Sequence, residues 1–215
     1  MPRPLLYKID GSPPSTAVRM LAQIIGLELD FQDLDFFKLE HKSPEFLKLN
    51  AMGTVPTLKD GAFVISESHT ILQYLLSKYA TKEQQEELYP SDLETRALIN
   101  QYLFFDTGIF FIRFKNVILP ILFEGVKGPT EKGLAGIDEA FGILEAYLGN
   151  KTYMIGDRLT IADLSLSATA ACMRSVHTLN PDKFPRVAKW LSRMEQKPYF
   201  KTMLNTVEVI KSHIS

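Results

Sequence analysis

Three short stretches of this sequence combine side chains and backbone groups that could do chemistry, and the first is Gly11-Ser12-Pro13-Pro14. It lies between an apolar run and a stretch of helical periodicity, so the Ser12 hydroxyl is expected beside a helix N-terminus. Free backbone N–H groups and the helix dipole favour an anion there. Serine is also a preferred helix cap. Two interpretations follow: Ser12 merely caps the helix, or it holds a reacting anion.

The second stretch is Asn50-Ala51-Met52-Gly53-Thr54-Val55-Pro56-Thr57, in which a proline enters a predicted strand. Proline is tolerated there at a sheet edge or with a cis peptide bond. If the Val55–Pro56 bond is cis, the backbone N–H and C=O of Val55 stay free to pair with an extended ligand, as an added strand would. The alternative is a simple turn before an edge strand.

The third stretch, Ile65-Ser66-Glu67-Ser68-His69, begins another predicted helix. Ser68 could cap this helix, and Glu67 adds a carboxylate beside the free N–H groups. The pair suits a zwitterion, whose amine would meet Glu67 and whose carboxylate would meet Ser68 and the N–H groups. The alternative is an ordinary acidic first turn.

Other common kinds of site are not indicated. The sequence has four histidines, without a second metal ligand at helical spacing: His41, His69, His177 and His213. It contains no glycine-rich phosphate loop and no serine in the G-x-S-x-G context of an α/β-hydrolase. The sole cysteine, Cys172, follows two alanines in a helical stretch and is expected to pack rather than to react.

The elements that would position these stretches alternate between strand and helix up to about residue 80. We predict strands at 5–9 and 29–36, paired strands at 57–58 and 62–65 around an Asp-Gly turn, and helices at 15–25, from 43 onward and at 66–79. The order β-α-β-α-β-β-α implies a mixed sheet with helices packed on it.

The strand signals end after Pro90. Long helical patterns follow at 92–124, 131–148, 160–176, 184–196 and 199–211. The boundary near residues 81–92, which contains the exposed polar segment 81–87, therefore divides an α/β domain, residues 1–82, from an all-helical domain, residues 90–215. In the second domain Thr160 and Asp163 match a capping box, so we assign Asp163 to a structural cap rather than to acid catalysis.

The composition is that of a globular protein, with 215 residues, 46% hydrophobic residues and a formal net charge of -1. This balance gives no attraction to nucleic acid or to an acidic membrane surface. The apolar run 117–123 is too short to cross a bilayer. One cysteine cannot form an internal disulfide, which fits a reducing compartment. We expect a cytoplasmic protein without a nucleic-acid or membrane partner.

Together the three stretches describe a thiol-activating group, a backbone clamp for a short peptide and an anchor for an α-amino acid. The sequence resembles the cytosolic glutathione transferases, and in particular the insect delta and epsilon classes. The resemblance rests on YKIDGSPP, KSPEFLKLNAMGTVPTL, FVISESHTILQYL, ELYPSDLETRALINQYLFFD and GDRLTIADLS, in this order and over nearly the whole chain. It implies a thioredoxin-like N-terminal domain, a helical C-terminal domain and a homodimer, with glutathione as co-substrate and neither a bound cofactor nor a metal.

The resemblance also implies roles for single residues. Ser12 would be the catalytic residue, donating a hydrogen bond to the glutathione sulfur. Glutathione would be bound by His41, Gly53, Thr54, Val55, Pro56, Glu67, Ser68 and His69. Val55 would pair with the cysteinyl backbone, and Glu67 and Ser68 would hold the γ-glutamyl end. His41 would meet the glycyl carboxylate, or it is a solvated surface residue.

Two positions depart from the family pattern. Gly53 stands where a histidine often precedes T-V-P, which removes a contact to the glycyl carboxylate and leaves more to His41. Thr16 stands where an arginine is frequent, and Arg19, one turn later, is expected to replace part of its charge. From Gly53 we expect glutathione binding that is weaker but not lost, and the two departures together bear on the catalytic strength.

The electrophile pocket is expected on the first long helix. Phenylalanines crowd this helix at positions 104, 105, 110, 111, 114 and 123. They cannot all face one side, so some must leave the core. We assign Phe110, Arg113 and Phe114 to the pocket, and the others to the core or to a dimer contact.

Three functions are compatible with this sequence. The first is a glutathione transferase that conjugates small hydrophobic electrophiles in detoxification. The second is a carrier of glutathione or apolar ligands with little turnover, which Gly53 and Thr16 favour. The third is a glutathione-dependent peroxidase or isomerase. A redox thiol-transferase is disfavoured, because Ser12 stands where that chemistry needs a cysteine.

Overall fold

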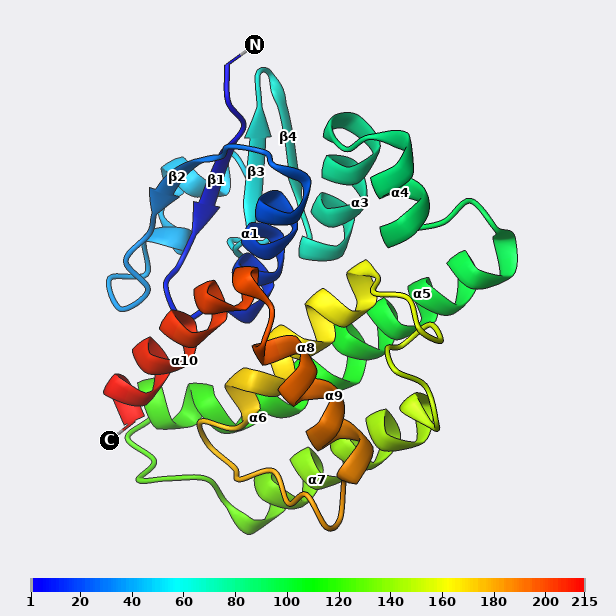
Figure 1. The fold of residues 1–215 in the computed structure, drawn as a ribbon. Coiled ribbons are helices and arrows are strands. Elements are labelled where there is room, and N and C mark those ends of the chain that lie inside the picture. Colours follow the sequence, from blue (N-terminus) through cyan, green and yellow to red (C-terminus); the bar gives the residue numbers. More distant parts are fainter. Residues whose placement is uncertain (1, 215) are drawn as a thin grey trace.

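A four-stranded mixed sheet organises the first part of the chain in the computed structural model, which describes residues 2–214 (Figure 1). Its strands are β1 (Leu5–Lys8), β2 (Asp30–Asp33), β3 (Thr57–Asp60) and β4 (Phe63–Ser66), in the order β2-β1-β3-β4. β1 pairs parallel with β2 and antiparallel with β3, and β3 pairs antiparallel with β4. The predicted mixed sheet is thus confirmed.

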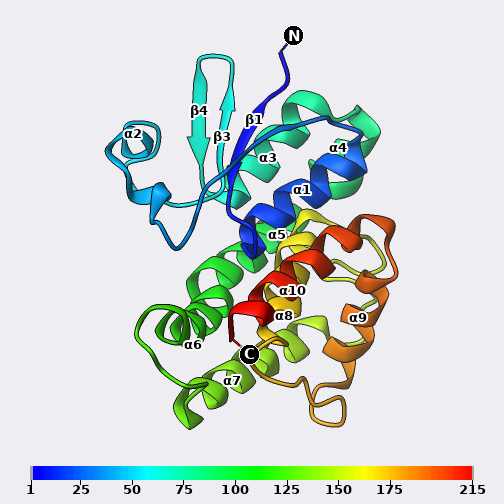
Figure 2. The same cartoon turned by 90° about the vertical axis from the view of Figure 1, so that its left-hand side faces the viewer.

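Helices α1 (Pro13–Ile25) and α3 (Ser68–Tyr79) lie on one side of this sheet, and the short α2 (Pro44–Leu47) lies on the other (Figure 2). The helices contact each other and bury the apolar stripes expected from their periodicity. The fully buried side chains between helices and sheet are Leu6, Val18, Leu21, Leu58, Ile71, Leu72 and Leu75. This core holds the start of α1 and the start of α3 at fixed positions beside the sheet.

Two element boundaries differ from the predictions. The strand expected at 29–36 ends at Asp33, because β2 is an edge strand and pairs only with the four residues of β1. The helix expected from residue 66 begins at Ser68, because Ser66 still pairs with Thr57 in the sheet. Glu67 lies between strand and helix with a left-handed φ of 68°.

From Tyr79 to residue 214 the named elements are helical, apart from an isolated β-bridge between Ile155 and Arg158. The helices are α4 (Lys82–Leu88), α5 (Leu93–Phe105), α6 (Phe111–Phe123), α7 (Glu131–Leu148), α8 (Ile161–Met173), α9 (Pro185–Glu195) and α10 (Lys201–Ile214). The segment expected to be exposed and polar at 81–87 forms α4, which Thr81 and Gln84 start with a capping box. The long helix expected at 92–124 is divided by a π-helical segment, Asp106–Phe110. The helix continues after this wide turn as α6.

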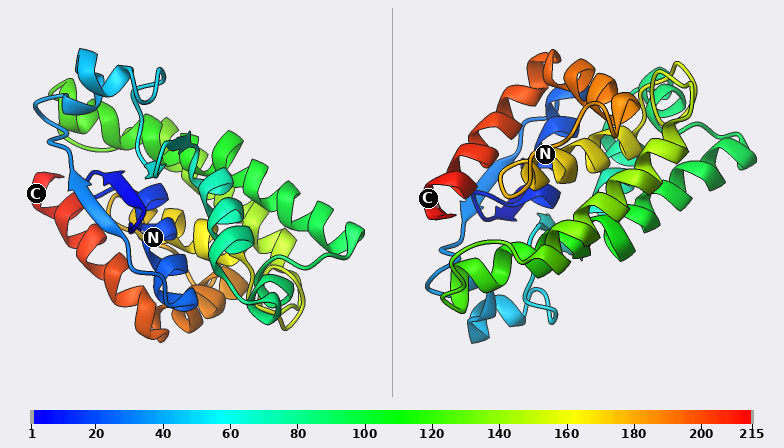
Figure 3. Two further views of the ribbon diagram at one scale, coloured as in Figure 1. Left: turned by 90° about the horizontal axis from the view of Figure 1, so that it is seen from above. Right: turned by 90° about the horizontal axis from the view of Figure 1, so that it is seen from below.

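Helix α8 is the centre of the helical part, with all of its residues buried. Asp163 accepts hydrogen bonds from the Thr160 and Met154 backbone N–H groups and from Trp190 Nε1, each at 2.9 Å. The capping role predicted for Asp163 is confirmed, and the same carboxylate also joins α9 to the start of α8. Helix α10 lies against α1 and α8, so the end of the chain returns to the first helix (Figure 3).

Within residues 2–214, each helix is too short or too polar to cross a lipid bilayer.

Candidate active site

A cleft of about 470 Å³ lies between the sheet side of the molecule and helices α6 and α10. The loops after β1 and before β3, and the start of α3, contribute one wall. From the sequence-predicted site this wall brings together Ser12, His41, Gly53, Thr54, Val55, Pro56, Glu67 and Ser68. Three stretches that are far apart in the sequence therefore line one cavity.

Ser12 is both a helix cap and a cleft residue, so the two interpretations of this serine coexist. It is the N-cap of α1 with an extended backbone, and Pro13 and Pro14 occupy the first helical positions. The Ser12 Oγ accepts hydrogen bonds from the Ser15 N–H at 3.3 Å and from the Ser15 hydroxyl at 3.0 Å. A hydroxyl has two acceptor positions and one donor. With both acceptor positions occupied, the Ser12 proton remains available to a group in the cleft.

Thr16 and Arg19 point away from the cleft. Thr16 is almost fully buried, and its hydroxyl lies 2.7 Å from the Thr206 hydroxyl of α10 and 3.0 Å from the Ser12 carbonyl. The Arg19 guanidinium lies over the Phe31 ring, 5.6 Å from its centroid. The expectation that Arg19 replaces a missing charge at the site is therefore wrong. Thr16 instead connects α1 to α10.

The Val55–Pro56 peptide bond is cis, as the second stretch suggested. Val55 lines the cleft, and neither its N–H nor its C=O has a hydrogen-bond partner in the described part of the chain. The Thr54 carbonyl, in contrast, accepts from Asn50 Nδ2 at 2.9 Å and from the Thr57 hydroxyl at 3.0 Å. These contacts fix the loop and leave a free donor and a free acceptor at Val55.

Gly53 is required by a close approach of two loops. Its φ is 56°, and a Cβ atom there would lie 2.7 Å from the His41 carbonyl oxygen and 2.9 Å from Lys42 Cδ. Real Cβ atoms do not come so close, so a histidine cannot occupy this position without moving the chain. The glycine that stands in place of the family's histidine therefore allows residues 41 and 42 to pack directly on position 53.

His41 is a buried residue, and its interpretation as a solvated surface residue is wrong. It is 7% exposed and stacks on Phe36, with ring centroids 5.3 Å apart. Its Nδ1 is buried and makes no hydrogen bond to any residue from 2 to 214. Burial first, and then the charge of Lys42, lower the pKa of His41 below its usual value. Both causes favour the neutral form of the imidazole.

Glu67 occupies the N-cap position of α3, with Ser68 as the first helical residue. Ser68 therefore does not cap this helix. The Glu67 side chain makes no cap hydrogen bond, and its carboxylate has no partner among the described residues. Left-handed backbone is uncommon for residues other than glycine and typically costs about 1–3 kcal/mol. The chain thus holds an unpaired carboxylate and the first N–H groups of a helix at the edge of the cleft.

His69 does not line the cleft, contrary to the expectation that it contacts glutathione. Its Nε2 lies 2.7 Å from the Ser165 hydroxyl of α8 and 3.4 Å from Asp106 Oδ2. Ser165 also donates to Asp106 Oδ2, at 2.5 Å. Because α3 winds away from the cleft after Ser68, the next side chain points into the helical part. His69 therefore joins the start of α3 to the helical part of the chain.

The opposite wall of the cleft is largely apolar and comes from α6 and α10. It consists of Phe111, Ile112, Phe114, Lys115, Ile118, Leu119 and Leu122 of α6 and of Val209, Ile210 and His213 of α10. Phe36 and Phe37, from the loop after β2, also line the cleft. Phe37 stacks on His213 with centroids 4.8 Å apart.

Of the three residues assigned to the electrophile pocket, only Phe114 lines the cleft. Phe110 is fully buried and packs on Phe105 and Phe141, at centroid distances of 5.5 and 5.6 Å. Arg113 faces α7, where it pairs with Glu139 at 2.7 Å. The assignments of Phe110 and Arg113 are wrong, because Phe110 ends the π-helical turn inside the core and Arg113 lies on the face of α6 that packs on α7. The four-residue spacing of Phe111, Lys115 and Leu119 was the signal that could have identified the stripe of α6 that lines the cleft.

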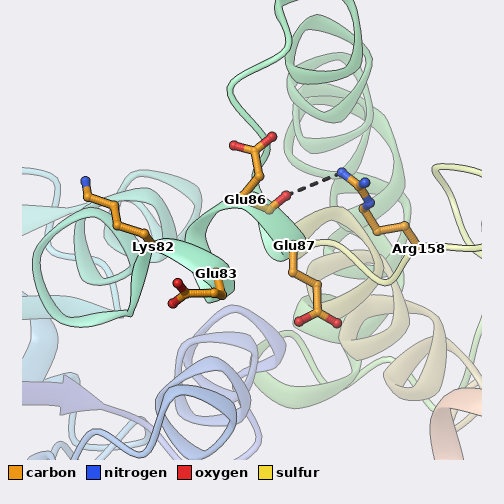
Figure 4. Close-up of a pocket in the computed structure, with 5 residues that line it drawn as sticks. All are labelled: Lys82, Glu83, Glu86, Glu87 and Arg158. Atoms are coloured by element: carbon orange, nitrogen blue, oxygen red, sulfur yellow. Dashed lines mark hydrogen bonds between the residues drawn. The ribbon is translucent and has the colours of Figure 1, made fainter.

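A second hollow of about 480 Å³ lies on the surface beside α4 (Figure 4). It is lined by Lys82, Glu83, Glu86, Glu87 and Arg158, and Arg158 Nη1 donates to the Glu86 carbonyl at 3.3 Å. It consists of solvated charged side chains and shares no residue with the cleft.

Across the described chain, no three histidine, cysteine, aspartate or glutamate side chains cluster as metal ligands would.

Two family models match the chain. Residues 6–83 match the model described as "Glutathione S-transferase, N-terminal domain", and residues 107–198 match "Glutathione S-transferase, C-terminal domain". A curated relative, glutathione S-transferase 1 of Manduca sexta, is 33% identical over 198 residues, which cover 91% of this chain and 89% of that protein.

The chain is also similar to solved structures of glutathione transferases. An epsilon-class glutathione S-transferase from the housefly, Musca domestica, matches with a TM-score of 0.91 and 33% identity over 98% of both chains. A glutathione transferase homolog from Drosophila mojavensis, solved with bound glutathione, matches with a TM-score of 0.92 and 33% identity over 100% of this chain and 97% of that chain. The predicted fold and the resemblance to insect delta and epsilon relatives are confirmed.

Proposed function

Because this chain belongs to the glutathione S-transferase family, a family of transferases with glutathione as co-substrate, we propose that it joins glutathione to small hydrophobic electrophiles and that Ser12 stabilises the thiolate. One observation carries this proposal. The Ser12 hydroxyl lies in the cleft at the N-terminus of α1, and Ser15 occupies its acceptor positions. Its proton can therefore be donated to an anion in the cleft.

The free energy needed to lower the pKa of the thiol is of the size that these groups can supply. A free thiol has a pKa of about 8.5, so only a few per cent is thiolate at neutral pH. Lowering that pKa by about two units takes about 2.7 kcal/mol. A hydrogen bond to a charged group contributes about 1.5–3 kcal/mol, and a helix N-terminus about 0.3–1 kcal/mol. The thiol proton leaves to solvent, the sulfur forms a bond to the electrophilic carbon, and the leaving group departs with its electron pair.

The remaining groups of the sheet-side wall suit the tripeptide. The free N–H and C=O of Val55 would pair with the cysteinyl backbone, within the loop that Gly53, Thr54 and Pro56 shape. Glu67 would take the α-amine of the γ-glutamyl residue, with Ser68 and the first N–H groups of α3 on its carboxylate.

The glycyl carboxylate would lie near His41. Because burial lowers the pKa of His41, this contact would be a hydrogen bond from a neutral ring rather than an ion pair. The weaker glutathione binding expected from the sequence is therefore retained in the proposal. His69 would act as a positioning residue for α3 through Ser165 and Asp106.

The apolar wall of α6 and α10 suits the hydrophobic electrophile, with Phe114 and Phe111 among its side chains.

Turnover of a chromogenic aryl halide with glutathione tests the function. We expect Ser12→Ala to lower kcat/KM by about a hundredfold, in line with the loss of about 2.7 kcal/mol. Wild-type binding to a glutathione matrix without turnover would instead favour the low-turnover carrier. Turnover of hydroperoxides or double-bond isomers alone would favour the peroxidase or isomerase.

We further propose a cytoplasmic homodimer. Helix α5 exposes Leu93 and Phe104 at 80% and 74%, and the two lie eleven residues apart, on one face of the helix. Large apolar side chains exposed to this extent suit contact with a second copy of the chain. The buried free thiol of Cys172 suits a reducing compartment. Sedimentation of the wild type and of Phe104→Ser tests the dimer, since the variant should sediment as a smaller species.

A further inference from the structure

Lys115 is a cation in the middle of the apolar wall of the cleft. It lies on α6 four residues after Phe111 and four residues before Leu119, and all three side chains line the cleft. Residues at this spacing share one face of a helix. Lys115 therefore extends from the face that borders the electrophile side of the cavity, and it is exposed to solvent there.

The charge of Lys115 is not neutralised by the protein. Between residues 2 and 214 it has neither an ion pair nor a hydrogen bond to its Nζ. The other cation on this part of α6, Arg113, turns to α7 and pairs with Glu139. The helix thus places a paired cation outside the cleft and an unpaired one inside it.

Two other charged residues of the cleft, in contrast to Lys115, have partners. Asp10 is engaged by Lys8 Nζ at 2.7 Å, and Lys42 Nζ donates to the Met52 carbonyl at 2.9 Å. Among the described carboxylates and ammonium groups that line the cleft, only Glu67 and Lys115 are left without a partner. Glu67 lies on the wall that suits glutathione, and Lys115 on the wall that suits the second substrate.

An unpaired ammonium group within an apolar wall favours a particular kind of ligand. An apolar ring system would pack on Phe111 and Leu119, and an anionic oxygen on the same molecule would accept a hydrogen bond from Lys115 Nζ. Packing of the ring removes water from around this contact, which strengthens the attraction between the two charges. A neutral ligand of the same shape gains only the packing.

We propose that Lys115 makes the electrophile side of the cleft selective for amphipathic anions, that is, apolar molecules with one carboxylate or sulfonate group. The proposal rests on the proposed function only in assigning this wall to the second substrate. The binding step itself requires neither glutathione nor turnover, so it can be tested separately.

Two fluorescent dyes that differ in one group provide the test. Anilinonaphthalene sulfonate carries a sulfonate, and N-phenylnaphthylamine has the same ring system without it. We expect Lys115→Met to raise the Kd of the sulfonate dye by about tenfold, equivalent to about 1.4 kcal/mol. The Kd of the neutral dye should change by less than about twofold. Lys115→Arg should retain most of the affinity for the sulfonate dye. Lys189 is an exposed lysine of α9, and Lys189→Met should leave the Kd of both dyes unchanged.

Three results would overturn the proposal. Equal losses for both dyes would mean that the Lys115 stem contributes only packing. An unchanged Kd of the sulfonate dye would mean that the Lys115 charge is solvated and does not contact the sulfonate. A loss of glutathione affinity in Lys115→Met, measured by calorimetry, would assign this cation to the tripeptide instead. Ser12→Ala separates the two proposals, because it should abolish most turnover and leave the binding of both dyes unchanged.

Discussion

Ser15 donates two hydrogen bonds to the Ser12 Oγ, one from its backbone N–H at 3.3 Å and one from its hydroxyl at 3.0 Å. The hydroxyl of Ser15 is itself buried, so this arrangement is protected from water. The pair orients the proton of Ser12, because the two acceptor positions of that oxygen are occupied.

Ser15→Ala should therefore weaken thiolate stabilisation while it keeps the N-cap bond from the backbone. One hydrogen bond between hydroxyls is worth about 1 kcal/mol, so kcat/KM at about pH 6.5 should fall about fivefold. Well above the usual thiol pKa of about 8.5, the difference should vanish, because the thiol ionises without help. The pH profile of kcat/KM is the measurement. A loss of the same size at every pH would show that Ser15 acts only on the fold.

Glu67→Ala should weaken glutathione binding by more than about tenfold, since the variant removes the sole unpaired carboxylate described on that wall of the cleft. Calorimetric titration with glutathione measures the change. Glu87→Ala, on the exposed surface of α4, is the matched control and should bind as the wild type does. Unchanged affinity in Glu67→Ala would mean that the α-amine lies elsewhere.

Gly53→Ala should destabilise the protein more than Gly61→Ala does. Both glycines have a positive φ, 56° and 61°, so both substitutions incur a backbone cost of about 1–2 kcal/mol. Only at Gly53 would the new Cβ meet other atoms, at 2.7 Å from the His41 carbonyl oxygen, whereas open space surrounds Gly61. Overpacking should add about 1–3 kcal/mol at Gly53. Urea unfolding compares the two variants, and equal losses would contradict the close approach of the loops.

Asp163→Ala should lower the free energy of unfolding by about 3 kcal/mol or more, because it leaves the Met154 and Thr160 N–H groups and Trp190 Nε1 buried without an acceptor. Denaturant unfolding gives the value. Asp182→Ala, on the exposed loop before α9, is the control and should cost less than about 0.5 kcal/mol. A similarly small loss for Asp163→Ala would show that the cap contributes little.

Local signals in the sequence were sufficient for much of this structure. The serine before two prolines predicted a helix start, and the hydroxyl and carboxylate three residues apart predicted the cap at Thr160 and Asp163. Both depend on a few adjacent residues, whose backbone preferences are the same in any fold. The proline before β3 was identified for the same reason.

The errors at the site depend on contacts between distant parts of the chain or on an altered helical turn. Thr16 pairs with Thr206, which lies 190 residues later, and no periodicity indicates such a partner. Phe110 belongs to the π-helical turn Asp106–Phe110 and is fully buried, and a regular helical periodicity does not indicate such a turn. His69 was misassigned because its partners, Ser165 and Asp106, come from the helical part.

The central claim is that the Ser12 hydroxyl stabilises the glutathione thiolate, and the pKa of the bound thiol tests it most directly. Thiolate absorbs in the near ultraviolet, so a pH titration of the enzyme–glutathione complex gives this pKa without any electrophile. In the wild type we expect a value about two units below the usual 8.5 or so, and in Ser12→Ala a return to within about half a unit of it. The same lowered pKa in both proteins would contradict the assignment of Ser12.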